Sequence, residues 1–455
     1  MTAKRLLVLG LIELITPILA QDTPTLYTVY PKNSSDLAAT EGIFAQLAGI
    51  AGDPYFMFNS SKEGVRANFW QLQLAPSNAT EVSKNQDVLD VYEACNAGCI
   101  FGPTPPTECT DSCYDPTSSI VRQRDAGDEM AFISQEEGHA LTDYAGNYYF
   151  DSTAGAGVTV YILDSGADLT NSEFRPVSVR WIPAGNGNFE ETDSSVYIDA
   201  NGLKGGKGHG TCMLSRATGN VYGTSKNVDA VLARVPPSPA EMDWIDGLEK
   251  ILEDAETNGG SNKVLSLSIY WPLGTLRQSN IDSMAELLKK IVATGVFVVV
   301  GTGNGATTSI EGYPAGFARA SDSNYIPEML VVGALNPTTG LKWASSNEDL
   351  NIDITYAPGE KVHCADTLSS GIKETSGTSP AAATVAGLAA YFIGLGTSGS
   401  DVKALIQDNS YERVQSDDIV RAIWNGVKFG DIPAVDIPTA NATVATRVPR
   451  RGLGY

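Results

Sequence analysis

Short runs of β-branched and aliphatic residues recur through the middle of the chain, separated by longer segments of mixed polarity. The runs are apolar at nearly every position, a pattern typical of strands buried on both faces of a parallel sheet. They lie at residues 158–163, 231–235, 264–268, 296–300 and 329–333.

The segments between these runs carry apolar residues at helical spacing. Four of them share one face of a helix that begins near 238–241 with a capping pattern: Trp244, Leu248, Ile251 and Leu252. A second helix is predicted at 281–293, before Gly295. The alternation of strand and helix predicts an α/β fold with a mostly parallel central sheet covered on both faces.

The N-terminal part of the chain predicts a separate and smaller folding unit. An extended segment at 26–30, a helix at 35–47 and a strand at 69–74 suffice for a small α+β domain. The stretch after it is rich in Cys, Pro, Gly and Thr, which is typical of a linker. The predicted division is a leader at 1–20, a small domain at 21–93, a linker at 94–116, a large domain at 117–430 and a tail at 431–455.

The first twenty residues have the three parts of a secretory signal peptide. Lys4 and Arg5 supply the charge, residues 6–20 are mostly apolar, and small Ala20 ends the run. A membrane anchor or a core helix is the alternative, but the run is short for a bilayer span. We therefore expect a secreted, extracellular protein.

The charge balance is strongly acidic, with 53 Asp and Glu against 31 Lys and Arg and a formal net charge of -22. Such a surface repels phosphate backbones and anionic lipid headgroups, so we expect no nucleic-acid partner and no membrane partner. A chain of 455 residues with 42% hydrophobic content is long enough for one large core and a smaller one.

Four of the six cysteines are clustered in the predicted linker, at Cys95, Cys99, Cys109 and Cys113. They could form two disulfides or a zinc site, and an oxidising compartment favours disulfides. Cys212 and Cys364 stand apart and are either free or paired. Secretion would make four glycosylation sequons available, which we expect on exposed loops: Asn33, Asn59, Asn78 and Asn441.

Two candidate catalytic side chains lie where the carboxyl ends of parallel strands meet, the edge at which such sheets bind ligands. Asp164 directly follows the run at 158–163 and precedes Ser and Gly, a sequence that also suits an ordinary turn. His209 stands between two glycines and is one of three histidines, with His139 and His363. A general base that works near neutral pH must come from these three, and a structural loop histidine is the alternative.

Ser379 follows Gly and Thr and precedes a helix of small residues that extends through Gly387. Pro380 suits the first helical position, which would place Ser379 at the positive helix end, where unpaired N–H groups can bind an oxyanion. The alternative is that Ser379, or its neighbours Ser376 and Thr378, only caps the helix.

Together these segments resemble the subtilisin-like serine proteases, over roughly residues 148–395. The motifs stand in the family's order: Asp-Ser-Gly at 164–166, Gly-His-Gly-Thr at 208–211, Gly-Thr-Gly-Asn ending at Asn304, Tyr-Pro-Ala at 313–315 and Gly-Thr-Ser at 377–379. The resemblance implies a subtilisin-like three-layer α/β fold. It also implies that the small domain is a propeptide that inhibits its own enzyme, cut away between about residues 115 and 138, with bonds after Arg122 or Arg124 as candidates.

The resemblance further implies a catalytic triad of Asp164, His209 and Ser379. Ser379 would attack the peptide carbonyl, His209 would transfer the proton, and Asp164 would orient His209. Asn304 and the Ser379 backbone N–H would bind the oxyanion. The implied substrate is a polypeptide, no cofactor is needed for the chemistry, no metal ligands are assigned, and structural calcium is possible.

The chain departs from the family pattern at three places. Family substrates pair along the segment that corresponds to Ser268, Ile269 and Tyr270, and Gly303 is a further expected substrate-binding residue. Tyr270 replaces a glycine of the family, which predicts a narrower cleft. Cys212 stands where a histidine often follows His-Gly-Thr, which predicts a thiol near the active site. The helix after Ser379 also lacks the family's proline.

The predicted function is therefore a secreted serine endopeptidase that acts through an acyl-enzyme and is made as a zymogen. Its activity should rise with pH through the imidazole range, because the base must be neutral. One alternative is an inactive secreted pseudoprotease or binding protein on the same fold. Another is a lipase or cutinase-type esterase, but Ala381 replaces the second Gly of Gly-x-Ser-x-Gly and the triad order differs.

Overall fold

The computed structural model describes residues 25–32, 37–51, 58–59, 70–93, 119–153, 155–169, 171–174, 178–183, 208–235, 241–367, 371–416 and 419–432. The chain forms two compact units, Met1–Cys95 and Asn96–Tyr455, which are described one at a time. The predicted leader, the cysteine cluster, the sequons at Asn33 and Asn441 and nearly all of the predicted tail lie outside the described residues.

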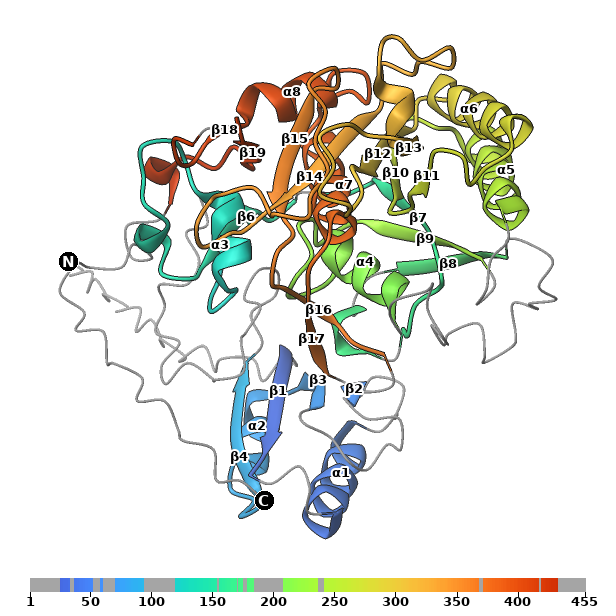
Figure 1. The fold of residues 1–455 in the computed structure, drawn as a ribbon. Helices are drawn as coiled ribbons and strands as arrows, with labels where there is room; N and C mark the ends of the chain where they lie inside the picture. Colours follow the sequence, from blue (N-terminus) through green and yellow to red (C-terminus); the bar gives the residue numbers. More distant parts are fainter. Residues whose placement is uncertain are drawn as a thin grey trace, which may run out of the picture. The chain divides into compact units, whose positions relative to one another are not determined.

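The N-terminal unit is a four-stranded antiparallel sheet with two helices, drawn in blue in Figure 1. The strand order is β2-β3-β1-β4. The elements are β1 (Thr25–Pro31), α1 (Leu37–Ala51), β2 (Phe58–Asn59), β3 (Trp70–Leu74), α2 (Pro76–Val82) and β4 (Val88–Glu93). Its core joins Val29 of the central strand to Ile43 and Val82 of the two helices, all fully buried.

The predicted elements of this unit are present. The segment 26–30 lies in β1, the helix expected at 35–47 is α1, and the strand expected at 69–74 is β3. The expectation that the sequons lie on loops is wrong for two of them, because Asn59 ends strand β2 and Asn78 is part of helix α2.

The large unit is built on a nine-stranded sheet in the order β18-β19-β15-β14-β12-β10-β7-β9-β8. Only the edge strand β18 runs antiparallel to its neighbour. The strands are β7 (Thr159–Asp164), β8 (Ser178–Pro183), β9 (Asp229–Arg234), β10 (Lys263–Leu267), β12 (Phe297–Gly301), β14 (Leu330–Leu335), β15 (Ile354–Pro358), β18 (Tyr411–Glu412) and β19 (Arg421–Ala422). The five predicted buried strands are β7, β9, β10, β12 and β14, with ends one or two residues from those predicted.

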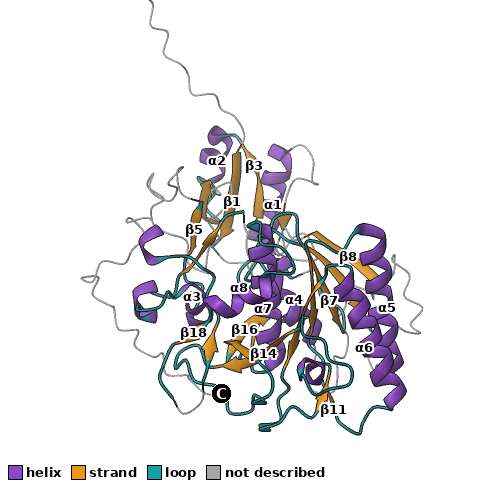
Figure 2. Ribbon diagram, turned by 90° about the horizontal axis from the view of Figure 1, so that it is seen from above, coloured by secondary structure: helices purple, strands orange, loops and turns teal. Residues whose placement is uncertain are grey.

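Helices cover both faces of this sheet, and the strands send alternate side chains into two cores. Within β7, Val160 and Ile162 join one core, whereas Tyr161 and Leu163 join the other. The first core is completed by α4 (His209–Thr218), α7 (Thr378–Gly394) and α8 (Val402–Asn409), and the second by α5 (Glu241–Asn258) and α6 (Gln278–Ala293). Figure 2 shows the resulting layers, which confirm the predicted three-layer α/β fold.

Several shorter elements complete the large unit. They are the antiparallel pairs β5 (Ile120–Gln123) with β6 (Tyr148–Asp151), β11 (Trp271–Pro272) with β13 (Gly312–Tyr313) and β16 (Val362–Ala365) with β17 (Ile372–Thr375), and helix α3 (Asp128–Ser134). The β16–β17 hairpin matters for the site, because β17 ends just before helix α7 begins.

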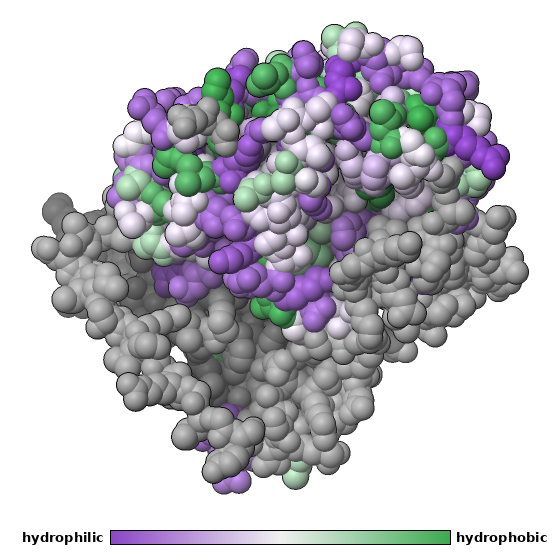
Figure 3. Space-filling model, in the orientation of Figure 1, coloured by the Kyte–Doolittle hydropathy of each residue, from purple (hydrophilic) through white to green (hydrophobic). Residues whose placement is uncertain are grey.

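The described surface is mixed in polarity. On the face that Figure 3 shows, apolar residues form small patches separated by polar ones. Exposed large apolar side chains come from distant parts of the chain, for example Met242, Leu350 and Ile419. Among the described residues, no helix combines the length and the apolar character needed to cross a bilayer.

Candidate active site

Asp164 is the last residue of the central strand β7, and its side chain is almost fully buried at 1% exposure. The backbone N–H and the hydroxyl of Ser165 both donate to its Oδ1, at 2.7 and 3.1 Å. The chain then turns at Gly166, whose φ of 105° favours glycine. The carboxylate is therefore held in one orientation at the carboxyl edge of the sheet.

His209 is the first residue of helix α4 and follows Gly208, which has a φ of 78°. Its Nδ1 lies 2.9 Å from both carboxylate oxygens of Asp164 and donates to them. The glycine after the histidine is needed for this approach, because a Cβ on Gly210 would lie 2.1 Å from the Gly166 carbonyl oxygen. With the proton of neutral imidazole on Nδ1, Nε2 is the ring nitrogen that can act as a base.

Ser379 lies in the first turn of helix α7, but the helix begins two residues earlier than predicted, at Thr378. The N-cap is Gly377, which offers no side-chain cap, and Pro380 is the third helical residue. The expectation of Pro380 at the first position was wrong, and so was the alternative that Ser379 caps the helix. The Ser379 N–H belongs to the first turn, where backbone donors have no partner within the helix.

Asn304 follows strand β12 through Thr302 and Gly303, and its side chain is oriented by the start of helix α7. Its Oδ1 accepts hydrogen bonds from the N–H and the hydroxyl of Thr378, at 2.9 and 3.0 Å. Because the oxygen is taken by these donors, the Nδ2 end is free to donate. A Cβ built on Gly377 would lie 3.6 Å from Asn304 Nδ2 and 3.7 Å from the Ser379 nitrogen, so the two donors flank one small space.

The candidate residues come from distant segments and meet at one edge of the sheet. Asp164 ends β7, Asn304 follows β12, and β10 lies between these two parallel strands. Ser268, the residue after β10, donates its hydroxyl to the Ser379 carbonyl at 3.1 Å. Helix α7 therefore begins beside the carboxyl ends of the central strands.

The predicted substrate-binding segment has two buried side chains and one at its surface. Ser268 and Ile269 are each only 7% exposed, so they offer little surface to a substrate. Tyr270 is half-buried, and a Cβ on Gly303 would come within 3.0 Å of its ring carbons. Burial raises the pKa of the Tyr270 phenol, and the nearby Glu311 carboxylate raises it further.

The helices that carry His209 and Ser379 pack directly on each other. A Cβ on Gly387 of α7 would lie 2.3 Å from the Ala217 carbonyl oxygen of α4. Arg216 of α4 is fully buried and donates from Nε and Nη2 to the Thr384 hydroxyl of α7, at 3.1 and 3.0 Å. This close packing fixes the two helix starts relative to each other.

Buried groups of opposite charge are packed around helix α4, and each partly offsets the effect of burial on the pKa of the others. Burial disfavours the Arg216 cation and lowers its pKa, which the Glu129 and Glu173 carboxylates partly oppose. Burial would raise the pKa of Glu129, but the hydrogen bond from His363 and the charge of Arg216 bring it below its usual value. The same hydrogen bond raises the pKa of His363. Burial raises the pKa of Glu173 and lowers that of Lys226 to about 7.

A disulfide joins Cys212 of helix α4 to Cys364 of strand β16. Both residues are buried, at 1% and 0% exposure, so the predicted reactive thiol beside the site was wrong. The hairpin makes a second contact with the start of α4, since Lys373 Nζ donates to the Gly208 carbonyl at 2.8 Å. The disulfide therefore ties the helix of His209 to the hairpin that leads into the helix of Ser379.

Removal of this cross-link with Cys212→Ala and Cys364→Ala should lower the free energy of unfolding by about 2–5 kcal/mol. The disulfide closes a loop with a sequence separation of 152 residues. Without it the unfolded chain has more conformational entropy, which favours unfolding. Urea unfolding of phosphonate-inactivated protein, which cannot digest itself, would measure the change. Cys212→Ala alone should cost nearly as much as both substitutions, and an unchanged midpoint would contradict the prediction.

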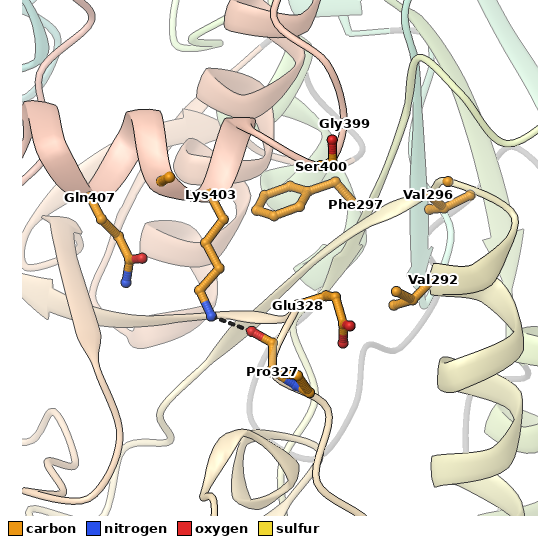
Figure 4. Close-up of a pocket in the computed structure, with 11 residues that line it drawn as sticks. Val292, Val296, Phe297, Pro327, Glu328, Gly399, Ser400, Lys403 and Gln407 are labelled. Carbon is orange, nitrogen blue, oxygen red and sulfur yellow. Dashed lines mark hydrogen bonds between the residues drawn. The ribbon is translucent and has the colours of Figure 1, made fainter.

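A cavity of about 400 Å³ lies beside helix α8, shown in Figure 4. Val296 and Phe297 line it at the start of β12, whereas Asn304 follows the end of that strand. The cavity therefore lies at the opposite edge of the sheet from Asp164 and His209. Within the described ranges, no group of three or more His, Cys, Asp or Glu side chains is placed to hold a metal ion.

Comparison with known proteins, by family model and by sequence, finds matches to one protease family. The model of the subtilase family matches residues 155–426. Subtilisin-like protease 7 of Trichophyton equinum is 33% identical over 255 residues, which cover 55% of this chain and 56% of that protein. Subtilisin-like serine protease Pen c 1 of Penicillium citrinum is 30% identical over 325 residues, or 70% of this chain and 72% of that protein.

Among solved structures, a cold adapted subtilisin-like serine proteinase superposes with a TM-score of 0.53 at 23% identity. The match covers 67% of this chain and 100% of that one. At this identity the likeness concerns the fold alone.

Proposed function

The chain belongs to the subtilase family, and we propose that it is a secreted serine endopeptidase, made as a zymogen, that cuts peptide bonds through an acyl-enzyme. The observation that carries the proposal is the 2.9 Å contact of His209 Nδ1 with both carboxylate oxygens of Asp164. It occurs at the sheet edge where the Asn304 amide and the Ser379 N–H flank one space. These are the parts that acyl transfer by a serine requires.

In the first half of the reaction, Ser379 Oγ attacks the scissile carbonyl carbon while His209 Nε2 takes the hydroxyl proton. Asp164 stabilises the imidazolium that forms, and it is already aligned with Nδ1. The C–N bond then breaks, and His209 gives its proton to the leaving amine. The product of this step is an ester between Ser379 and the acyl part of the substrate.

In the second half, water replaces the amine. His209 removes a proton from the water as its oxygen attacks the ester carbonyl, and the C–O bond to Ser379 breaks. The proton returns to Ser379 Oγ, and the carboxylic product leaves.

The oxyanion in both halves would be bound by Asn304 Nδ2 and the Ser379 N–H. Thr378 supports this role, because its N–H and hydroxyl hold Asn304 Oδ1 and so direct Nδ2 away from them. Loss of such a donor in subtilisin costs about a hundredfold to a thousandfold in kcat. From the sequence, Thr378 was predicted only as a possible helix cap. Its position beside the candidate nucleophile Ser379 is the signal that could have indicated a role in the site.

Secretion and a zymogen form are supported by separate features. The buried Cys212–Cys364 disulfide suits an oxidising compartment, as does the charged and apolar pattern at 1–20. The N-terminal unit has its own sheet and core, which suits an inhibitory propeptide that folds before it is removed.

Maturation would cut the chain before Ile120 rather than after Arg122. Strand β5 (Ile120–Gln123) pairs with β6, and Gln123 is buried with its Nε2 bonded to the Val221 carbonyl at 2.9 Å. Cleavage after Arg122 would cut through this paired strand, and cleavage after Arg124 would also remove the Gln123 contact from the large unit. We therefore place the processed bond between about residues 115 and 119.

The test is labelling of the matured protein with a fluorophosphonate, a probe that reacts with activated serines. We expect one phosphonate per molecule, located on Ser379 by mass spectrometry, and a loss of casein hydrolysis in proportion to labelling. Protein unfolded before the probe is added should not react, since the reactivity depends on His209 and Asp164.

Other outcomes separate the alternatives. Labelling of Ser379 with hydrolysis of esters but not of casein or short peptides would indicate an esterase. A folded, matured protein that takes up no label would indicate an inactive pseudoprotease.

A further inference from the structure

Tyr270 occupies a space beside the oxyanion loop that two glycines leave open. A Cβ on Gly303 would lie 3.0 Å from Cδ2 and Cε2 of the ring, and a Cβ on Gly312 would lie 2.5 Å from Cζ and 2.7 Å from Oη. The ring therefore rests on the backbone of both glycines. A side chain at Gly312 would displace the ring, and a side chain at Gly303 would crowd it.

The ring is also held in place from both sides along the chain. Before it, Ile269 is buried and Ser268 is bonded to the Ser379 carbonyl at 3.1 Å. After it, strand β11 pairs with β13 in the register Pro272 opposite Gly312. With its backbone fixed at both neighbours, Tyr270 has little freedom to move off the glycines.

This space adjoins the atoms of the proposed reaction. The scissile carbonyl oxygen would point at Asn304 Nδ2, and the residue before Asn304 is Gly303, on which the ring rests. The substrate residue that owns this carbonyl has its α-carbon one bond away from the reacting carbon. Its side chain must therefore lie close to the loop at 302–304, where the ring already stands.

We propose that Tyr270 fills the site for the side chain of the residue that supplies the scissile carbonyl, so that the enzyme cuts after glycine and alanine and rejects large side chains. This inference rests on the proposed peptidase function and names its substrate class. A pocket gains about 1–3 kcal/mol per accommodated methylene, or about 10–200-fold in kcat/KM, so the volume of a tyrosine ring is enough to reverse a preference.

The test compares tetrapeptide p-nitroanilides that differ only in the last residue, alanine or phenylalanine. Wild type should prefer alanine by about a hundredfold in kcat/KM. Tyr270→Gly should raise the ratio of kcat/KM for the phenylalanine substrate to kcat/KM for the alanine substrate by about 10–200-fold. Tyr270→Phe, which keeps the ring volume, should retain the preference for alanine.

The matched control is Tyr325→Gly, at a tyrosine that is 39% exposed and lies in the segment before strand β14. It should leave the ratio of the two substrates as in wild type. Equal use of both substrates by wild type, or an unchanged ratio in folded Tyr270→Gly and Tyr270→Ala, would overturn the inference while phosphonate labelling of Ser379 still supports the peptidase. Absence of labelling in wild type would overturn both.

Discussion

Replacement of Ser379 by alanine is expected to lower kcat for peptide hydrolysis by about a million-fold, the loss that follows removal of the nucleophile in subtilisin. Without Oγ no acyl-enzyme forms, and His209 has no hydroxyl proton to take. A residual rate about 10³–10⁴-fold above that in water should remain, because the oxyanion donors Asn304 and the backbone N–H are intact. The measurement is casein and p-nitroanilide hydrolysis by matured protein.

Ser376→Ala is the matched control, because Ser376 is exposed, lies three residues earlier and accepts a hydrogen bond from the Lys361 N–H at 2.9 Å. It should retain nearly full kcat. The Ser379→Ala chain should also stay full-length, so matured protein must be obtained by adding active enzyme. Full activity in Ser379→Ala would refute the assignment of the nucleophile, and spontaneous maturation of that variant would refute autoprocessing.

Replacement of Asp164 by asparagine should lower kcat by about ten-thousand-fold with little change in fold. The carboxylate is 1% exposed and accepts from His209 Nδ1. An amide of the same shape would present a donor there, and the imidazole would then carry its proton on Nε2, where a base is needed. Steady-state kinetics at constant pH, with far-ultraviolet circular dichroism to check the fold, would measure the effect.

Asp229→Asn provides the comparison for this substitution. Asp229 is exposed and begins β9, opposite Thr159 at the start of β7, whereas Asp164 ends β7. The same chemical change at the far edge of the sheet should leave kcat unaltered. If Asp164→Asn behaved like Asp229→Asn, the orientation of His209 would have to come from another group.

The strands of the large sheet could be predicted because their signal is local. A strand buried on both faces must be apolar at consecutive positions, and the runs that became β7, β10 and β12 show this directly. The order of the Asp164, His209 and Ser379 motifs along the chain likewise identified the family, since each motif lies within a few residues of sequence.

Features that depend on contacts between distant segments of the chain were decided only by the tertiary structure. Helix α7 begins at Thr378 rather than Pro380 because the Thr378 N–H finds its acceptor on Asn304, which follows another strand. The partner of Cys212 is 152 residues away, so no local pattern could name it.

The amino-acid sequence by itself thus determined the strands, the family and the candidate catalytic residues of this protein. The fit of Tyr270 against Gly303 and Gly312 was decided only when β10, β12 and β13 came together. Each helix or strand is favoured by interactions between residues that are close together in the sequence. The close approach of side chain to backbone that shapes the substrate site is instead set by the order and packing of the whole sheet.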